Sequence, residues 1–458
     1  MSHQEIQLVA VLLVVLFAAG LLFLERKWWG GVSNGLWIPV IWMAILGSRP
    51  VSMWFGSGTA VDAARADLEG SPVDASIFLV LIIAAAFVLS KRRIDWHDIM
   101  AENKWLFIFF LYLGISVLWS DFPDVAFKRW IKDAGSVLMV LVVLTEDEPA
   151  QAIRATFFRC TCLLIPTSVL LVKCFPYIGS SYDIWDGQPY YCGVGTNKNM
   201  LGMALFVCGL FLAWAAFDFR DEDTGEINKA RVLTNLVLGL MTIYLLAKAH
   251  SATAIGCSVL GICIILGMRL AIRWRVKRLG TYGFALALLL ALLYTTFDVD
   301  ELLMRALGRD TTFTGRTDIW KAVLKENINP LIGAGHASFW LSADRVERLS
   351  QGLYFKLNEA HNGYLEVYVN SGLIGSFLLI MVLISGAGKI KRAAVAGSTV
   401  AALRLGLLLG TVAYGMTEAV FRFSFIFFAL LLVLMERPLE AESFDETEEA
   451  DRYSAVAT

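Results

Sequence analysis

Arg316 and His361 are the two side chains in this hydrophobic chain whose types and surroundings best suit chemistry. The guanidinium of Arg316 is a planar fork of donors suited to a diphosphate or a carboxylate, and Asp318 follows it closely. The imidazole of His361 titrates in a range that suits a general base or a hydrogen-bond donor, and Asn362 and Glu366 stand beside it. These residues would bring a fixed cation, a titratable group and carboxylates together.

Each of these residues also has a purely structural interpretation. A cation at the start of a helix, where Arg316 stands, is mildly unfavourable, which argues for a role beyond structure. A lone histidine before an apolar run, such as His361, is more often structural than chemical. Asn362 could cap the helix that follows, and Glu366 would suit the dipole of its first turn. His336 lies between turn-forming residues and is a weaker candidate.

Further cations occur where an anion would explain them. Lys198 follows Asn197 at the start of an apolar run, and a cation at a helix N-terminus is electrostatically awkward without an anion nearby. Lys128, Arg129 and Lys132 lie on the external side of the expected bundle, against the positive-inside tendency. They could bind an anionic headgroup or substrate, or they could belong to an interfacial helix with snorkelling side chains.

The elements that position these residues are apolar runs. Hydrophobic residues make up 57% of the chain and charged residues 17%, which excludes soluble globular and disordered proteins. Apolar runs recur along the whole length and predict about 12–13 transmembrane helices. The expected spans are 6–24, 36–55, 77–89, 105–119, 135–145, 155–175, 200–217, 232–247, 252–270, 282–297, 364–385, 402–417 and 419–435. The predicted fold is therefore an all-α polytopic membrane protein.

Basic clusters predict the orientation of this bundle. They recur after alternate spans, at 25–27, 91–93, 269–278 and 389–392. The positive-inside rule then places the long polar loop on the external face. The predicted parts are 1–297 and 363–436 as transmembrane regions, 298–362 as a partly helical external loop, and 437–458 as an acidic cytoplasmic tail. Two shorter external segments, 51–75 and 176–198, could gather with the loop over one cavity.

Local patterns predict some details of these segments. In the long loop, 318–324 has helical periodicity, with Thr317 as the N-cap and Asn329 and Pro330 as the end of the helix. Glu418 and Arg422 stand one helical turn apart and are expected to pair with each other.

No pattern indicates a metal or a nucleic acid. The seven cysteines show no spacing typical of metal ligands, although Cys174 and Cys192 flank an external loop and could pair in an oxidising compartment. The net charge is −2, and no basic stripe with interleaved aromatic residues is present.

The polar motifs resemble those of a known superfamily. They are Gly-Arg-Thr-Asp-Ile-Trp at 315–320, Pro-Leu-Ile-Gly-Ala-Gly at 330–335, His-Asn-Gly-Tyr-Leu-Glu at 361–366 and Gly-Leu-Ile-Gly at 372–375. In this order and topology they resemble the O-antigen ligase and Wzy-type polysaccharide polymerase superfamily. The upstream runs 119–123, 128–130 and 197–202 look more like the succinoglycan-type exopolysaccharide polymerases.

The resemblance implies a C-type membrane glycosyltransferase that works without metal or other cofactor. It implies an undecaprenyl-diphosphate-linked glycan donor and a glycan acceptor, at the periplasmic face of the bacterial inner membrane. The acceptor hydroxyl attacks the anomeric carbon and the lipid diphosphate leaves. Arg316, with Lys198 or Arg129, would stabilise the leaving group, and His361 would act as a base or orient the acceptor.

One position departs from the superfamily. Relatives often carry a basic residue in a Ser-Lys/Arg-Thr-Ala run, whereas this chain has Ala252 there. Lys248 or His250 could supply the missing cation.

Several functions therefore stay open. A polymerase of lipid-linked repeat units is the expected one, and a ligase that transfers a finished glycan to lipid A core or another acceptor would share its site. A transporter of the lipid-linked glycan would favour charged or broken helices at mid-membrane and paired halves, which this sequence lacks. A non-catalytic assembly subunit is the fourth candidate. The expected partners are the donor, the acceptor, membrane lipids, and chain-length regulators and export proteins, with no nucleic acid.

Overall fold

The computed structural model describes residues 2–56, 71–182, 187, 189–219, 226–274, 316–351, 356–422 and 424–437. The described chain is almost entirely helical, which confirms the all-α fold expected from the apolar runs. The predicted span 282–297, the start of the long loop at 298–315 and the acidic tail from 438 onward lie outside the described residues.

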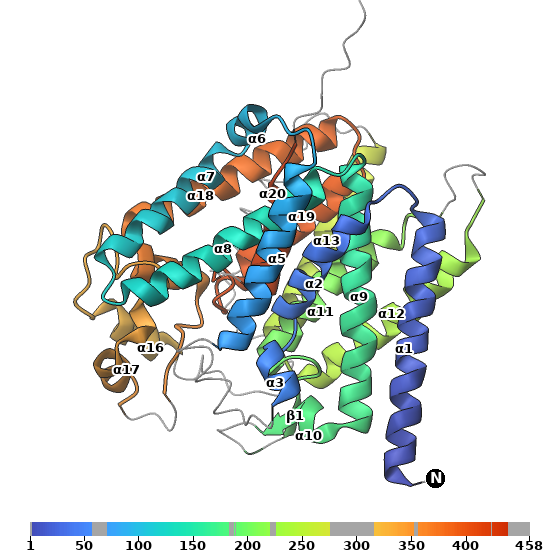
Figure 1. Ribbon diagram of the computed structural model, residues 1–458, viewed down its shortest axis with the longest axis horizontal. Coiled ribbons are helices and arrows are strands. Elements are labelled where there is room, and N and C mark those ends of the chain that lie inside the picture. The colour runs from blue at the N-terminus through green and yellow to red at the C-terminus, as the bar shows by residue number, and fades with distance from the viewer. Residues whose placement is uncertain are drawn as a thin grey trace, which may run out of the picture.

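The helices and strands follow the chain in a simple order (Figure 1). The α-helices are α1 (His3–Trp28), α2 (Trp37–Leu46), α3 (Val51–Phe55), α5 (Pro72–Ser90), α6 (Trp96–Glu102), α7 (Lys104–Ile115), α8 (Pro123–Leu144), α9 (Pro149–Cys174), α10 (Pro176–Gly179), α11 (Lys198–Ala215), α12 (Lys229–Ala249), α13 (Ala252–Arg273), α16 (Arg316–Leu324), α17 (Ala343–Leu349), α18 (Gly363–Val395), α19 (Val400–Tyr414) and α20 (Phe425–Leu434). Short 3₁₀ turns cover Asn34–Leu36, Ser116–Trp119 and Phe339–Leu341. The strands β1 (Ser180–Tyr182) and β2 (Pro189–Tyr191) form an antiparallel hairpin with Ser180 opposite Tyr191.

The bundle is that of a multi-pass membrane protein. By length and composition, seven described helices can cross a membrane, namely α1, α5, α9, α11, α12, α13 and α18. An eighth span is formed if α6 and the helix after it, which meet at 88°, are counted as one. The shorter apolar helices Asn34–Leu46, Val400–Tyr414 and Phe425–Leu434 fall below the usual spanning length. Of the thirteen predicted spans, all except 282–297 overlap described helices, but only seven or eight of these helices are long and apolar enough to cross a membrane.

Three predicted boundaries were wrong. The run 36–55 is broken, because α2 ends before Gly47 and α3 begins after Pro50, which cannot continue a helix. The run 419–435 becomes helical only at Phe425. Helix α8 begins at Pro123, well before the expected residue 135, because proline suits the first turn of a helix.

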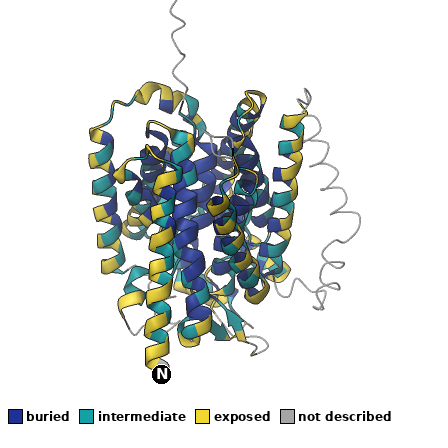
Figure 2. Ribbon diagram, turned by 90° about the vertical axis from the view of Figure 1, so that its right-hand side faces the viewer, coloured by how far each residue is buried: buried dark blue, intermediate teal, exposed yellow. Residues whose placement is uncertain are grey.

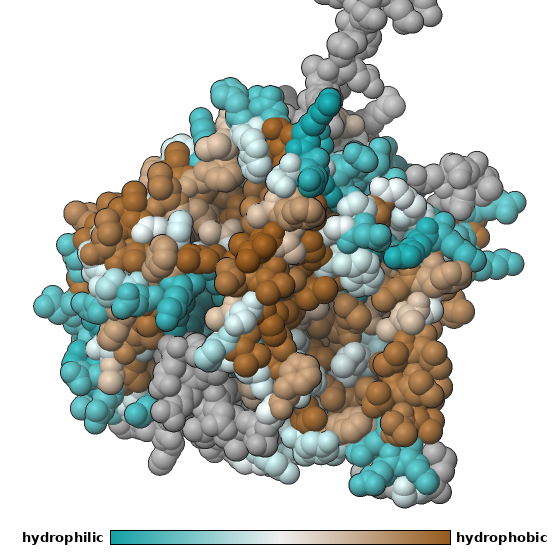
Figure 3. Space-filling view, in the orientation of Figure 1, coloured by the Kyte–Doolittle hydropathy of each residue, from teal (hydrophilic) through white to brown (hydrophobic). Residues whose placement is uncertain are grey.

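The most buried helices come from both halves of the chain and include α9 and α20. All ten residues of α20 are buried, and α20 packs against α19, α18, α11 and α8. Figure 2 shows buried residues gathered in the interior of the bundle, whereas α1, which begins at the marked N-terminus, is largely exposed and contacts mainly α9. The outer surface between the two ends of the bundle is largely apolar (Figure 3), as expected for helices in contact with lipid.

The two ends of the bundle differ in charge and content. Helices α16 and α17 lie at the same end as the N-terminus of α1 and the β1–β2 hairpin, opposite α6 (Figure 1). The basic runs 91–93 and 389–392 follow or end helices at that opposite end. The described part of the long loop, from residue 316 onward, therefore lies at the end opposite these two basic runs.

The long loop is fastened to a break in α18. Gly372 has a left-handed backbone (φ 65°), and a Cβ there would lie 2.2 Å from the carbonyl of Leu331. A Cβ on Gly333 (φ 69°) would lie 2.5 Å from the amide nitrogen of Ser371. Only glycine tolerates both the backbone and the approach. The freed backbone groups pair across this contact, with the Ala334 amide donating to the Val369 carbonyl at 2.9 Å.

Other details of the loop and its neighbours differ from expectation. Helix α16 begins at Arg316, so Thr317 lies inside its first turn and does not cap it. The helix ends at Leu324, and the side chain of Asn329 instead accepts the Leu331 amide at 3.0 Å in a separate turn. Cys174 and Cys192 are free thiols, so the pairing considered for them is not formed.

Candidate active site

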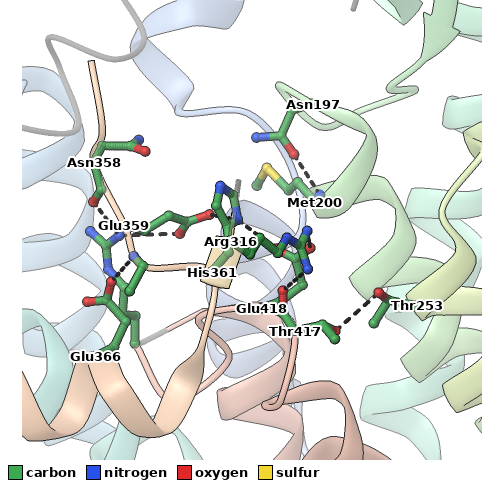
Figure 4. A network of polar contacts seen from close by, with 12 residues as sticks. Asn197, Met200, Thr253, Arg316, Asn358, Glu359, His361, Glu366, Thr417 and Glu418 are labelled. Atoms are coloured by element: carbon green, nitrogen blue, oxygen red, sulfur yellow. Dashed lines mark hydrogen bonds and ion pairs between the residues drawn. The ribbon is translucent and has the colours of Figure 1, made fainter. Parts of the chain in front are cut away.

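Five charged side chains form a chain of alternating sign at the loop end of the bundle (Figure 4). Arg316 Nη2 lies 2.9 Å from Glu418 Oε1, whose second oxygen lies 3.2 Å from His361 Nδ1. The same Nδ1 lies 3.1 Å from Glu359 Oε1, and Glu359 Oε2 lies 3.4 Å from Arg422 Nη1. We call these five residues the charged cluster. It brings together the two residues that the sequence singled out, Arg316 and His361.

The backbone around His361 holds its imidazole in place. Asn362 caps α18, as expected, by accepting the amides of Tyr364 and Leu365 at 3.0 Å. His361 itself has a left-handed backbone (φ 48°), a conformation that non-glycine residues rarely adopt and that is enriched at functional sites. The long helix α18 thus begins directly beside the charged cluster.

Arg316 is held by the turn between α19 and α20. Its guanidinium donates to the Thr417 carbonyl at 2.6 Å as well as to Glu418. The Thr417 hydroxyl contacts Thr253 of α13 at 3.1 Å. The Gly363 amide donates to the Gly415 carbonyl at 2.8 Å. The ends of α13, α16, α18 and α19 are therefore joined beneath one cluster.

The charges in the cluster fix the protonation of its members. Burial alone would lower the pKa of His361, but its hydrogen bonds to Glu359 and Glu418, together with their charges, raise it to about 10. Burial would raise the pKa of Glu359, but His361, Arg422 and Arg316 outweigh it and lower that pKa to about 2. At neutral pH His361 is therefore an imidazolium, which can donate a proton or a hydrogen bond but cannot accept a proton.

The charged cluster carries an excess of positive charge. At neutral pH it contains three cations, Arg316, His361 and Arg422, and two carboxylates, Glu359 and Glu418. In the described part of the chain, the second ring nitrogen of His361 has no hydrogen-bond partner. An anion that approaches the cluster would meet a net attraction and a ready donor.

The side chains at the start of α11 lie at the same end of the bundle. Asn197 caps α11 by accepting the Met200 amide at 2.9 Å, and Figure 4 includes both residues in the same view as Arg316 and His361. The Nζ atom of Lys198 lies 5.4 Å from the centre of the Tyr190 ring in β2. Lys248 lies 5.8 Å from the ring of the adjacent Tyr191. The hairpin thus gathers two lysines, of which Lys248 is one candidate for the cation missing at position 252.

Arg49 organises the segment that leads into α11. Its guanidinium donates to the carbonyls of Ile178 and Gly195 at 2.8 Å and of Gly193 at 3.3 Å. Its backbone amide donates to the Val194 carbonyl at 2.8 Å. Burial lowers the pKa of Arg49. One side chain therefore holds the turn that precedes Asn197.

Replacement of Arg49 by methionine is expected to loosen this turn. The carbonyls would lose their charged donor, and a loss of about 1.4 kcal/mol in ordering would raise the KM for a lipid-linked donor about tenfold. Arg49→Lys keeps the charge but not the fork of donors, so its KM should lie between those of the wild type and Arg49→Met. Steady-state kinetics and a melting curve of each variant check this. A KM equal to that of the wild type in Arg49→Met would contradict it.

Lys128 and Arg129 make contacts at a different place. Arg129 Nη1 donates to the Ala337 carbonyl at 2.6 Å, and Lys128 is exposed on α8. One turn further along α8, Asp133 contacts His336 Nε2 at 2.7 Å, and both side chains are buried. These contacts fasten α8 to the loop, so His336 has a structural partner. They do not place Lys128 and Arg129 in the charged cluster.

Asp318 and Glu366 also lie outside the charged cluster. Asp318 is exposed on α16, 3.8 Å from Lys321. Glu366 is buried, and its carboxylate accepts from Trp340 Nε1 at 2.9 Å and from the Ala360 amide at 2.6 Å. Glu366 thus supports the residue that precedes His361.

Sequence reasoning missed Glu359 and assigned the wrong partner to Glu418 and Arg422. The expected pair of Glu418 with Arg422 is wrong, because residues 415–422 form turns in which side chains four apart do not face each other. A charged pair within an apolar hairpin, and an acid two residues before His361, were the signals that could have pointed to Glu418 and Glu359.

Glu359, His361 and Glu418 could in principle hold a metal ion, because their ligand atoms lie within 4.8 Å of one another. However, Arg316 and Arg422 donate to these same carboxylates, and His361 donates to both. The negative charge of the two carboxylates is thus already balanced by three cations. A divalent ion would have to displace these cations against charge repulsion.

Chelation is therefore expected to leave the activity unchanged. Purified protein treated with EDTA and then assayed with and without added Mg²⁺ or Mn²⁺ should consume donor at the same rate. Loss of activity on chelation, restored by one of these ions, would contradict this prediction and assign the three residues as ligands.

The comparisons with known proteins agree with this geometry. A model of the O-antigen ligase family matches residues 235–380, a stretch that contains Arg316, Glu359 and His361. The exopolysaccharide production protein ExoQ of Rhizobium meliloti (strain 1021) is 27% identical over 317 residues, which cover 65% of this chain and 68% of that protein. The resemblance expected from the motifs is thereby confirmed. The chain is therefore similar to the O-antigen ligase and polymerase family, which indicates a membrane enzyme that processes polysaccharides.

Proposed function

We propose that this enzyme is a polymerase that joins undecaprenyl-diphosphate-linked oligosaccharide repeat units into a polysaccharide. The observation that carries the proposal is the charged cluster, in which two arginines and an imidazolium outnumber two carboxylates beside a helix N-terminus. Such a site suits a diphosphate leaving group. Similarity to a protein of exopolysaccharide production supports polymerase over other activities.

In the proposed reaction, Arg316 and His361 bind the diphosphate of the donor. An acceptor hydroxyl attacks the anomeric carbon, the bond from that carbon to the diphosphate oxygen breaks, and the electron pair stays with the diphosphate. Arg316 Nη2, which now lies 2.9 Å from Glu418, would turn to the diphosphate as negative charge develops. Lys198, at the start of α11, is a further candidate for contact with the donor.

The site is proposed to face the periplasm from the bacterial inner membrane. The basic runs gather at the opposite end of the bundle, where the positive-inside tendency places the cytoplasm. In the described part of the chain, the charged cluster lies at the end of the helices and not at mid-membrane, which disfavours a transporter.

Ligase activity is the second candidate, because the matched family model describes an O-antigen ligase. A polymerase and a ligase would use the same charged cluster and differ only in the acceptor. The deciding experiment gives the purified protein an undecaprenyl-diphosphate oligosaccharide as the only glycan, without lipid A, and resolves the product lengths. A ladder of multimers supports the polymerase. No extension, followed by transfer once lipid A core is added, would instead support the ligase.

A further inference from the structure

The two carboxylates of the charged cluster differ in their access to a substrate. Glu418 is buried, and each of its oxygens already accepts a hydrogen bond, one from Arg316 at 2.9 Å and one from His361 at 3.2 Å. Glu359 is 25% exposed, and its contact to Arg422 is longer, at 3.4 Å. A carboxylate has about four acceptor positions. Both carboxylates therefore keep spare lone pairs, but only Glu359 also has access to a substrate.

His361 cannot take the proton of an attacking hydroxyl. Its Nδ1 lies within hydrogen-bonding distance of two carboxylates, 3.1 Å from Glu359 and 3.2 Å from Glu418. Two anions on one nitrogen require that nitrogen to carry a hydrogen and favour the charged ring. The proton of the acceptor hydroxyl must therefore go to a carboxylate.

The structure holds Glu359 firmly beside His361. The intervening Ala360 is buried, and both of its backbone groups are bound. Its amide donates to Glu366 at 2.6 Å, and its carbonyl accepts from Trp320 Nε1 at 2.8 Å. The Asn358 carbonyl on the other side accepts from Arg422 at 3.1 Å. The backbone of residues 358–361 is thus fixed by hydrogen bonds, and it holds Glu359 and His361 side by side, as catalytic side chains require.

We propose that Glu359 is the general base of the transfer, resting on the proposed function above. As the acceptor oxygen bonds to the anomeric carbon, its proton passes to the carboxylate of Glu359. The bond to the diphosphate breaks, and its electron pair leaves with the diphosphate that Arg316 and His361 hold. Glu418 is then a positioning residue, which orients Arg316 and His361 without contact with the substrate.

An anionic acceptor distinguishes a base from a structural carboxylate. Azide attacks a carbon without losing a proton, so it needs no base. In Glu359→Gln, transfer to a sugar hydroxyl should fall about 10²–10⁴-fold, whereas formation of the glycosyl azide from the same donor should remain. In Glu418→Gln, both transfers should fall together, because the diphosphate site itself is disturbed. Glu347→Gln, an exposed acid on α17, serves as the matched control with both transfers unchanged.

A second substitution keeps the test valid if the amide variant does not fold. Glu359→Asp retains a carboxylate and is expected to retain more hydroxyl transfer than Glu359→Gln, with size-exclusion profiles and melting temperatures recorded for both. Undiminished hydroxyl transfer by Glu359→Gln would overturn the role of Glu359, as would equal loss of hydroxyl and azide transfer in the folded variant. A wild-type protein that consumes no donor with either acceptor would overturn the proposed function itself.

Discussion

Replacement of Arg316 by alanine is expected to lower kcat/KM for glycan transfer by about 10²–10³-fold, the usual effect of removing a donor from developing negative charge. Arg316 supplies one of three cations in the charged cluster, and its loss also leaves Glu418, which is 3% exposed, without its strongest partner. A buried carboxylate that keeps only His361 as its partner then repels the diphosphate. Kinetics with an undecaprenyl-diphosphate oligosaccharide donor check the effect.

Two further arginine variants separate charge from geometry. Arg316→Lys keeps the charge but replaces the guanidinium, which contacts both the Thr417 carbonyl and Glu418, by a single ammonium group. Its activity is therefore expected to lie between those of the wild type and Arg316→Ala. Arg348→Ala removes an exposed arginine of α17 that pairs with Glu326. It should leave transfer unchanged, because exposed ion pairs contribute little. Activity in Arg316→Ala equal to that in Arg348→Ala would rule out a catalytic role for Arg316.

Replacement of His361 by glutamine is expected to lower kcat/KM by a similar factor, about 10²–10³-fold, because a neutral amide replaces the imidazolium that faces the diphosphate. The pH dependence of the wild type tests the charge of His361 directly. With its pKa raised to about 10, the imidazolium persists through neutral pH and is lost only as the pH rises through about 10. Transfer should therefore hold up to about pH 9 and then decline.

A general base at position 361 would give the opposite profile. Activity would then fall as the pH drops below the histidine pKa, because protonation would remove the base. A pH profile of kcat/KM, measured for the wild type and for His361→Gln, decides whether His361 acts as a base or as a cation. A decline of the wild type toward acid pH that disappears in His361→Gln would show that His361 is a base and contradict its role as a cation.

The pKa shifts of His361 and Glu359 also predict how pH affects the free energy of unfolding. The raised pKa of His361 contributes stability that is complete below its unfolded value, about 6.5, and lost as the pH rises through about 10. The lowered pKa of Glu359 contributes stability that is complete above its unfolded value and lost as the pH falls through about 2. The single ion pair between these two residues contributes to both pKa shifts, so its contribution to stability is counted only once.

The sequence by itself determined the class of fold and predicted the end of the bundle where we propose that the chemistry occurs. Apolar runs predict helices because a membrane-spanning backbone must satisfy its own hydrogen bonds. Basic clusters predict the two faces. Asn362 as the cap of α18 follows from the preference of a short polar side chain for the first amides of a helix. Arg316 and His361 were found because both are unusual residues at the edges of expected helices.

Only the tertiary structure decided which charges meet. Glu418 stands 57 residues from His361 and 102 from Arg316, and no local periodicity connects positions so far apart. The pair expected from helical spacing, Glu418 with Arg422, failed because the chain turns there. The protonation of His361 depends on two carboxylates brought to one nitrogen by α18 and the α19–α20 turn. Electrostatic partners are set by distance in space, so the charge of His361 could be assigned only once its two carboxylate partners were known.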